Sequence, residues 1–396
     1  MPVVIYIFAL CAFAIGFTEF ISIGLSVALS ESFHVSTAQT GLVVTLYATG
    51  VVTGAPVLTA LASGWSRKRL LLTAMVVFSA GNVLAILSTH LPLLLAARLL
   101  SGLAHGVFFA VASSVATRLV APERSGVALS MVFGGVTIAM AMGVPAGTWL
   151  GSVLAWQWVF GLIALCGILG TIGMIRFMPA GAGDITSDTP ARYQLASLLN
   201  RHLLAAASLP LLSYTGSFAL YSFITPILIQ VTHTSIRGAS IVLVAYGIGA
   251  AAGNIAGGRM TDRIGIDRAS LWMLTGIALV LTLIAIAQDN FRFMIPLVML
   301  LGLTTYGSIP PLQSRILGMA RRHRPDALDA ASGLNIAAFN AGVVFGSMLG
   351  AVSLKLWGLT CLAGVGLIVA LLAIMTLSWQ RRQPLLRLDA TEVSKE

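Results

Sequence analysis

Residues 4–29 read VIYIFALCAFAIGFTEFISIGLSVAL, a continuous apolar run with one charged side chain, Glu19. A transmembrane α-helix needs about 20 mainly apolar residues, so this run is long enough to cross a bilayer. Strands of a membrane β-barrel would instead alternate apolar and polar residues over about ten positions. Eleven further runs predict an all-α membrane protein of twelve spans; they fall near 40–62, 70–88, 91–117, 125–153, 157–178, 203–231, 238–260, 269–288, 292–317, 328–353 and 357–379.

The overall composition agrees with this pattern. Hydrophobic residues make up 58% of the 396 and charged residues 9%, whereas soluble domains carry about 25% charged residues. The net charge of +10 does not indicate nucleic-acid binding, because 19 of the 23 Lys and Arg residues fall in alternate loops or in the C-terminal tail. This bias predicts a multi-pass protein of a bacterial inner membrane, in contact with lipid and with both termini in the cytoplasm.

Several chemical classes find no support in the sequence. The three cysteines lie far apart in apolar runs and lack the spacing of metal ligands. We find no phosphate-binding loop and no nucleophile–base pair, so we expect neither an enzyme nor a bound cofactor or metal. Without an ATP-hydrolysing domain, any transport must draw its energy from a gradient.

The two halves of the chain repeat. Tyr47-x-x-Gly-x-x-x-Gly recurs at Tyr246, and Gly143-x-x-x-Gly147-x-x-x-Gly recurs at Gly342, both after 199 residues. Six spans separate the copies, so the halves share one orientation and the substrate path is expected at their interface. The predicted organisation is two six-helix bundles with a cytoplasmic linker and tail, at 1–178, 203–380, 179–202 and 381–396 respectively.

Four motifs resemble those of one family. Gly258-Arg-Met-Thr-Asp262-Arg263-Ile-Gly resembles the G-x-x-x-D-R-x-G loop signature of the major facilitator superfamily. Arg98-Leu-Leu-Ser-Gly lies in the fourth span, Gly143-Val-Pro145-Ala-Gly147 in the fifth is similar to the antiporter motif, and Thr-Glu-Phe lies in the first. The resemblance covers the whole chain and is nearest to twelve-span drug:proton antiporters of the sugar-efflux and arabinose-efflux-permease type.

The resemblance implies roles for the loop and glycine motifs, with one departure. In the family the loop acid helps to latch the cytoplasmic side, and we expect that conformational role for Asp262 with Arg263. Ser63 stands at the corresponding first-half position, so the first-half latch is either weak or relies on Arg67 and nearby helix ends. Gly143, Gly147 and Gly258 permit close helix packing and Pro145 bends its span.

Three ionisable side chains in the first-half spans are expected to couple transport to protons. Glu19 lies deep in the first span, where an acid is costly and usually functional. Arg98 lies at a similar depth in the fourth span, so pairing would offset the desolvation of both, and His105 shares its helix face. The alternatives are a static interhelical pin for Glu19 and Arg98 and a simple hydrogen bond for His105.

The second half offers mainly neutral polar groups, which suit a neutral or aromatic substrate. Asn335 precedes Gly342 by seven residues and shares its packing face, whereas Asn340 lies roughly opposite and is freer to face a cavity. For any single group a hydrogen bond between helices is the alternative role. The expected substrate-binding residues are Asn340, Asn335, Tyr221, Tyr246 and, from the first half, Phe109.

Three functions fit these features. The first is a proton-coupled exporter that moves a small neutral or amphipathic solute, such as a sugar, nucleoside or drug, by alternating access and as a monomer. The second is a uniporter or importer on the same fold, in which Glu19 and Arg98 are structural. The third is a membrane sensor without transport, which the short tail disfavours.

Overall fold

The computed structural model describes residues 1–35, 37–178 and 190–386. Its described residues form helices and no strands. The α-helices are α1 (Val3–Gly24), α2 (Ser26–Phe33), α3 (Thr37–Thr53), α4 (Thr59–Leu61), α5 (Arg67–Ile86), α6 (Leu91–Arg118), α7 (Ser125–Ile138), α8 (Val144–Val153), α9 (Gln157–Phe177), α10 (Ala191–Leu198), α11 (Arg201–Tyr221), α12 (Ile224–Gln230), α13 (Ile236–Ile264), α14 (Ile266–Ala287), α15 (Phe291–Gly307), α16 (Ile309–His323), α17 (Leu328–Trp357) and α18 (Leu362–Arg382).

Short 3₁₀ and π segments connect several of these helices. The π segments are η1 (Gly54–Leu58) and η3 (Ala139–Gly143), and the 3₁₀ segments are η2 (Pro122–Arg124), η4 (Pro325–Ala327) and η5 (Leu359–Cys361). Each π segment lies at a proline of a membrane span, Pro56 within η1 and Pro145 just after η3. Proline cannot donate the helical hydrogen bond, and a π segment absorbs the resulting mismatch. The Pro145 side chain itself lies outside the described residues.

Twelve helical stretches of the described chain are long and apolar enough to cross a membrane. They confirm the twelve predicted runs, with ends that differ by a few residues in most cases and by more in the first, fifth and tenth. Six of the spans combine two or more helical segments, as in Leu42–Leu61, which joins α3, η1 and α4. The chain is therefore a multi-pass α-helical membrane protein.

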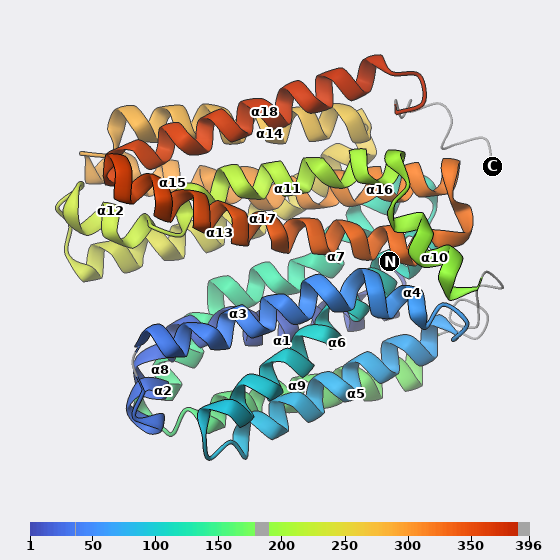
Figure 1. Cartoon of the computed structure of the whole chain (residues 1–396), viewed down its shortest axis with the longest axis horizontal. Helices are drawn as coiled ribbons and strands as arrows, with labels where there is room; N and C mark the ends of the chain where they lie inside the picture. The colour runs from blue at the N-terminus through green and yellow to red at the C-terminus, as the bar shows by residue number, and fades with distance from the viewer. Residues whose placement is uncertain (36, 179–189, 387–396) are drawn as a thin grey trace. The chain divides into compact units, whose positions relative to one another are not determined.

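The helices form two compact units (Figure 1). Unit 1 comprises 1–121, 131–200 and 324–337, and unit 2 comprises 122–130, 201–323 and 338–396. The first turns of α7 therefore belong to unit 2 and those of α17 to unit 1. The short helix α10 interrupts the 179–202 stretch, which its composition predicted to be a loop; residues 179–189 and the end of the tail lie outside the described residues.

The packing pattern within unit 1 recurs within unit 2. In unit 1, α3 packs on α6, α5 on α6 and α9, and α1 on α9. In unit 2, α13 packs on α15, α14 on α15 and α18, and α11 on α18. These pairs correspond one to one under the shift of 199 residues, which confirms the predicted pseudo-symmetric bundles.

The repeated glycines explain part of this correspondence. A Cβ at Gly147 would lie 2.6 Å from the Phe17 ring on α1, and one at Gly143 would touch the same ring. In unit 2, a Cβ at Gly342 would lie 2.7 Å from the backbone oxygen of Leu211 on α11. In both units, small residues therefore let a later span approach the first span of its half.

Candidate functional site

The ionisable side chains of unit 1 meet around Thr18 of α1. Arg98 of α6 is 1% exposed, and its guanidinium donates to the Thr18 hydroxyl at 2.7 Å and to the Thr18 carbonyl at 2.8 Å. The same guanidinium lies 4.2 Å from the centre of the Tyr47 ring. A buried cation is stabilised by such hydrogen bonds and by the face of an aromatic ring, so Arg98 is held in one place.

A chain of hydrogen bonds also holds the Thr18 side chain in place. The Thr18 hydroxyl donates to the Asn82 side-chain oxygen at 2.8 Å, and the Asn82 amide donates to the Phe78 carbonyl at 2.8 Å. Thr18 and Asn82 are both fully buried. Each polar group of the Thr18–Asn82 chain has a partner, which fixes the Thr18 oxygen toward Arg98.

Glu19 is the neighbour of Thr18 and is partly exposed rather than sealed in the core. Glu19 and Arg98 interact electrostatically, but within the described residues they form no ion pair. The expected direct pairing therefore does not occur in this structure. In this structure both terminal guanidinium nitrogens bond to Thr18 instead, one to its hydroxyl and one to its carbonyl.

His105 lies one step farther along the same cluster. Its Nδ1 is 2.9 Å from the Tyr47 hydroxyl, and its ring contacts those of Tyr47 and Phe109. Phe109 is 1% exposed and stacks on Phe133. Arg98, Tyr47 and His105 thus form a continuous series, while Phe109 is packed into the core of unit 1.

Unit 2 holds a group of aromatic rings in addition to its buried Arg315–Asp267 ion pair. Tyr221 of α11 stacks on Tyr246 of α13 with ring centroids 3.8 Å apart. The ring centroids of Tyr246 and Tyr306 of α15 are 6.1 Å apart. Tyr246 is fully buried and Tyr221 is partly exposed. Two of the expected substrate-binding residues are therefore in direct contact with each other.

The two asparagines of α17 occupy different environments. Asn335 is fully buried and Asn340 is partly exposed. Asn335 belongs to the part of α17 grouped with unit 1, and Asn340 to the part grouped with unit 2. The two residues therefore do not share one site within a unit.

The loop acid Asp262 caps a helix in unit 2. Its carboxylate accepts from the backbone N–H of Gly126 at 2.7 Å and from that of Val127 at 2.9 Å, in the first turn of α7. A carboxylate at a helix N-terminus satisfies free N–H groups and complements the helix dipole. Gly258 packs against the Gly126 carbonyl, and Arg263 is exposed.

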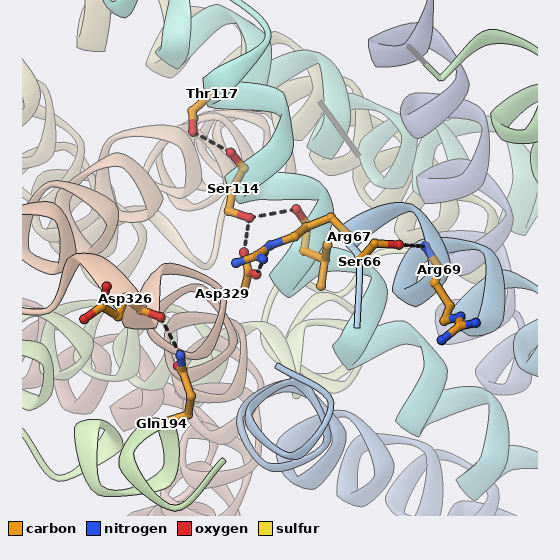
Figure 2. Close-up of polar contacts among 9 residues, drawn as sticks. Ser66, Arg67, Arg69, Ser114, Thr117, Gln194, Asp326 and Asp329 are labelled. Atoms are coloured by element: carbon orange, nitrogen blue, oxygen red, sulfur yellow. Dashed lines mark hydrogen bonds and ion pairs between the residues drawn. The ribbon is translucent and has the colours of Figure 1, made fainter. Parts of the chain in front are cut away.

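In the corresponding contact of unit 1, the loop side supplies a basic residue and the span supplies the acid (Figure 2). Arg67, at the start of α5, pairs with Asp329 in the first turn of α17 at 2.7 Å, and both are buried. Ser114 of α6 also donates to Asp329. The base comes from the loop side and the acid from the distant span, so Asp329 supplies the negative charge that Ser63 lacks.

The linker helix α10 reaches the same end of unit 1. Gln194 donates to the Asp326 carbonyl (Figure 2). Leu195 and Leu198 pack on a small cluster of Ala60, Ala327 and Ala330. Together with Arg67–Asp329 these contacts tie the start of α17 to unit 1.

Sequence reasoning missed residues whose role depends on distant partners. Thr18, Asn82, Asp329 and Ser114 carry no motif of their own, and their contacts bridge 64 to 262 positions of the chain. Arg315, within the predicted run 292–317, is fully buried and paired with Asp267. The 199-residue repeat was the one signal that pointed toward Tyr47, since it aligns that residue with Tyr246.

Twelve apolar spans in two repeated bundles are an architecture typical of membrane transporters. The family described as Major Facilitator Superfamily matches residues 8–210 and 206–394. The chain belongs to this family.

Named relatives cover nearly the whole chain. An MFS-type transporter of Bacillus subtilis, YtbD, is 36% identical over 94% of each chain. A chloramphenicol resistance protein of Streptomyces lividans is 31% identical over 93% of this chain and 96% of its own. A probable sugar efflux transporter of Helicobacter acinonychis is 30% identical over 93% of each chain.

Among solved structures, the superfamily transporter FucP is similar in fold. It superposes with a TM-score of 0.77 at 15% identity, over 96% of this chain and 98% of its own. At this identity the likeness concerns the fold alone.

Proposed function

We propose that the chain exports a small neutral or amphipathic solute across the bacterial inner membrane in exchange for protons, by alternating access. The observation that carries this proposal is that Glu19 forms no ion pair with Arg98 among the described residues. An acid in the first membrane span is next to a buried arginine, yet that arginine is bonded to Thr18. The carboxylate is therefore available to a proton, and a guanidinium that can replace the proton lies close by.

The proposed cycle exchanges the partner of Arg98. With Glu19 protonated, Arg98 rests on Thr18, as in this structure. When Glu19 loses its proton, the new negative charge attracts the guanidinium, and the exchange between Thr18 and Glu19 couples proton release to a change of conformation. Substrate leaves outward as the proton moves inward.

The two helix-end contacts serve the conformational change in this proposal. Asp262 on the α7 terminus and Arg67 on Asp329 each join a loop to a span that continues into the other unit. We place these contacts and both termini at the cytoplasmic face, in accord with the Lys and Arg bias. The two helix-end contacts form in one conformation and break in the other.

The names of the relatives support export and a neutral solute. One is named for chloramphenicol resistance and another for sugar efflux. Within the spans of this chain, the neutral polar and aromatic groups of unit 2 suit such solutes better than an ion.

Glu19→Gln is expected to abolish transport driven by a pH gradient, because glutamine keeps the shape of the side chain but cannot exchange a proton. The protein is reconstituted in proteoliposomes, and uptake of chloramphenicol is measured with and without the gradient. Exchange of labelled for unlabelled solute, which needs no net proton movement, should persist in the variant.

Two controls make the outcome decisive. Glu31→Gln removes an exposed acid outside the predicted spans of the described chain and should leave gradient-driven uptake unchanged. Gradient-driven uptake at the wild-type rate in Glu19→Gln would instead support a uniporter or importer in which Glu19 is structural.

A further inference from the structure

Asn82 is a buried amide on α5, whereas Glu19 and Arg98 of the proposed coupling site lie on α1 and α6. Its side chain is 1% exposed. A Cβ at the adjacent Gly81 would overlap the Ser101 hydroxyl of α6, so α5 and α6 approach closely about one turn from Arg98. A third helix therefore contributes a polar side chain to this part of unit 1.

The hydrogen bonds from Phe78 to Arg98 can run in only one direction. The Phe78 carbonyl only accepts, so the Asn82 nitrogen faces it and the Asn82 oxygen faces Thr18. The guanidinium only donates, so the Thr18 hydroxyl accepts from it and gives its single proton to Asn82. Asn82 therefore decides the direction of the Thr18 hydroxyl.

This direction affects how firmly Arg98 is held. A hydroxyl that donates a hydrogen bond becomes a better acceptor, because the bonds of a chain polarise one another. Without Asn82, the Thr18 hydroxyl would donate to the carbonyl one turn earlier in its own helix, a contact that threonine can make in any helix. The bond from Arg98 to the Thr18 hydroxyl would then be weaker, and Glu19 would compete more strongly for the guanidinium.

Unit 2 shows what stands at the position of Arg98 in the other half. Gly102 and Gly302 occupy corresponding positions, because a Cβ at either would overlap the carbonyl oxygen of the repeated tyrosine. Arg98 lies four residues before Gly102, and Val298 lies four residues before Gly302. Valine therefore replaces the buried arginine in unit 2.

The Asn82 position changes together with the arginine. Since α5 begins at Arg67 and α14 at Ile266, the shift of 199 residues places Leu281 of α14 at the position of Asn82. Leu281 and Val298 are both fully buried. A bundle of this design packs with leucine at this position, so helix packing alone does not explain the amide in the half that holds the arginine.

We propose that Asn82 is a positioning residue that directs the Thr18 hydroxyl and so sets the pH at which the carrier exchanges its proton. Its effect on Arg98 passes through Thr18, and its effect on Glu19 passes through Arg98. The inference rests on the proposed function and adds α5 to the helices that control it.

The first test replaces Asn82 with the residue that unit 2 has. In Asn82→Leu, the midpoint of the pH profile of chloramphenicol uptake, at a constant pH difference across the proteoliposome membrane, should move about 0.5–1 unit to lower pH. Asn82→Asp keeps the acceptor oxygen and should not move the midpoint to lower pH. Ser79→Ala removes a buried hydroxyl of α5 that donates to Met75 of the same helix; it is the matched control and should keep the wild-type midpoint.

A double variant shows whether Asn82 acts through Thr18. Thr18→Val already removes the hydroxyl, so adding Asn82→Leu to it should move the midpoint no further. The size-exclusion profile and melting temperature show whether each variant is folded. Shifts that add in the double variant would overturn the proposal, as would a wild-type midpoint in folded Asn82→Leu.

A measurement without transport separates this inference from the proposed function. The full chain is labelled with isotope-enriched arginine, and the Arg98 side-chain signal in its nuclear magnetic resonance spectrum is identified by its loss in Arg98→Lys. Asn82→Leu should move this signal in the same direction as Thr18→Val, and Ser79→Ala should not move it. If the signal moves but uptake does not depend on pH, the proton-coupling function is wrong and the placement of Arg98 by Asn82 stands. A signal that Asn82→Leu leaves unmoved would overturn the role of Asn82.

Discussion

Asp329→Ala is expected to destabilise the protein by about 3–5 kcal/mol, because it leaves the buried Arg67 guanidinium without its counter-charge. Arg67 is 6% exposed and lies 2.7 Å from Asp329, which also accepts from Ser114. The measurement is thermal unfolding of the purified protein in detergent. Arg69→Ala, a basic neighbour on the same turn whose side chain contacts only the Trp65 ring among its described partners, is the matched control.

A double variant tests whether the loss of stability comes from the charge that is left unpaired. Arg67→Met with Asp329→Leu removes both charges, and such replacements of buried pairs are often neutral. The double variant should therefore be more stable than Asp329→Ala alone. Equal destabilisation in Asp329→Ala and Arg69→Ala would show that the pair contributes no more than an exposed residue.

Thr18→Val is expected to produce the second large effect, on transport as well as on stability. Valine has the shape of threonine but lacks the hydroxyl that accepts from Arg98 and donates to Asn82, while its backbone carbonyl still accepts from the other guanidinium nitrogen. Each buried group left without a partner costs about 1–3 kcal/mol. The guanidinium nitrogen that loses the hydroxyl should turn to Glu19, so that the carboxylate holds its charge more tightly and transport requires more acidic conditions.

The measurement is the pH profile of transport in proteoliposomes, together with the melting temperature. In Thr18→Val the midpoint of the profile should move to lower pH. Thr18→Ser keeps the hydroxyl and should retain the wild-type midpoint, which separates the role of the oxygen from that of side-chain volume. An unchanged midpoint in a folded Thr18→Val variant would contradict the partner exchange of Arg98.

The fold could be predicted from the sequence because a bilayer imposes a single local rule. Apolar runs such as 4–29 must satisfy their own backbone hydrogen bonds, so length and hydrophobicity alone indicate helices. The repeat of Tyr47 at Tyr246 and of Gly143 at Gly342 then gave the two bundles, because small residues mark where helices approach closely.

The site could be predicted only in part. Charge in an apolar run singled out Glu19 and Arg98, since burying a charge is costly wherever the partner lies. The choice of Thr18 rather than Glu19 as the partner of Arg98 depends on side-chain geometry across two helices, which periodicity does not encode.

The first-half latch shows the same limit. Ser63 lacks the acid that the family pattern places there, and Asp329 supplies it from a span 266 positions away. A single sequence contains no signal that joins Arg67 to that residue.

If Glu19 carries the exchanged proton, the movement of that proton can be followed directly. Proteoliposomes that contain a trapped pH-sensitive dye are given a solute gradient and no imposed pH gradient. We expect a proton flux opposite to the solute flux in the wild type and none in Glu19→Gln, although the variant still exchanges solute. A solute-driven proton flux of wild-type size in Glu19→Gln would contradict it.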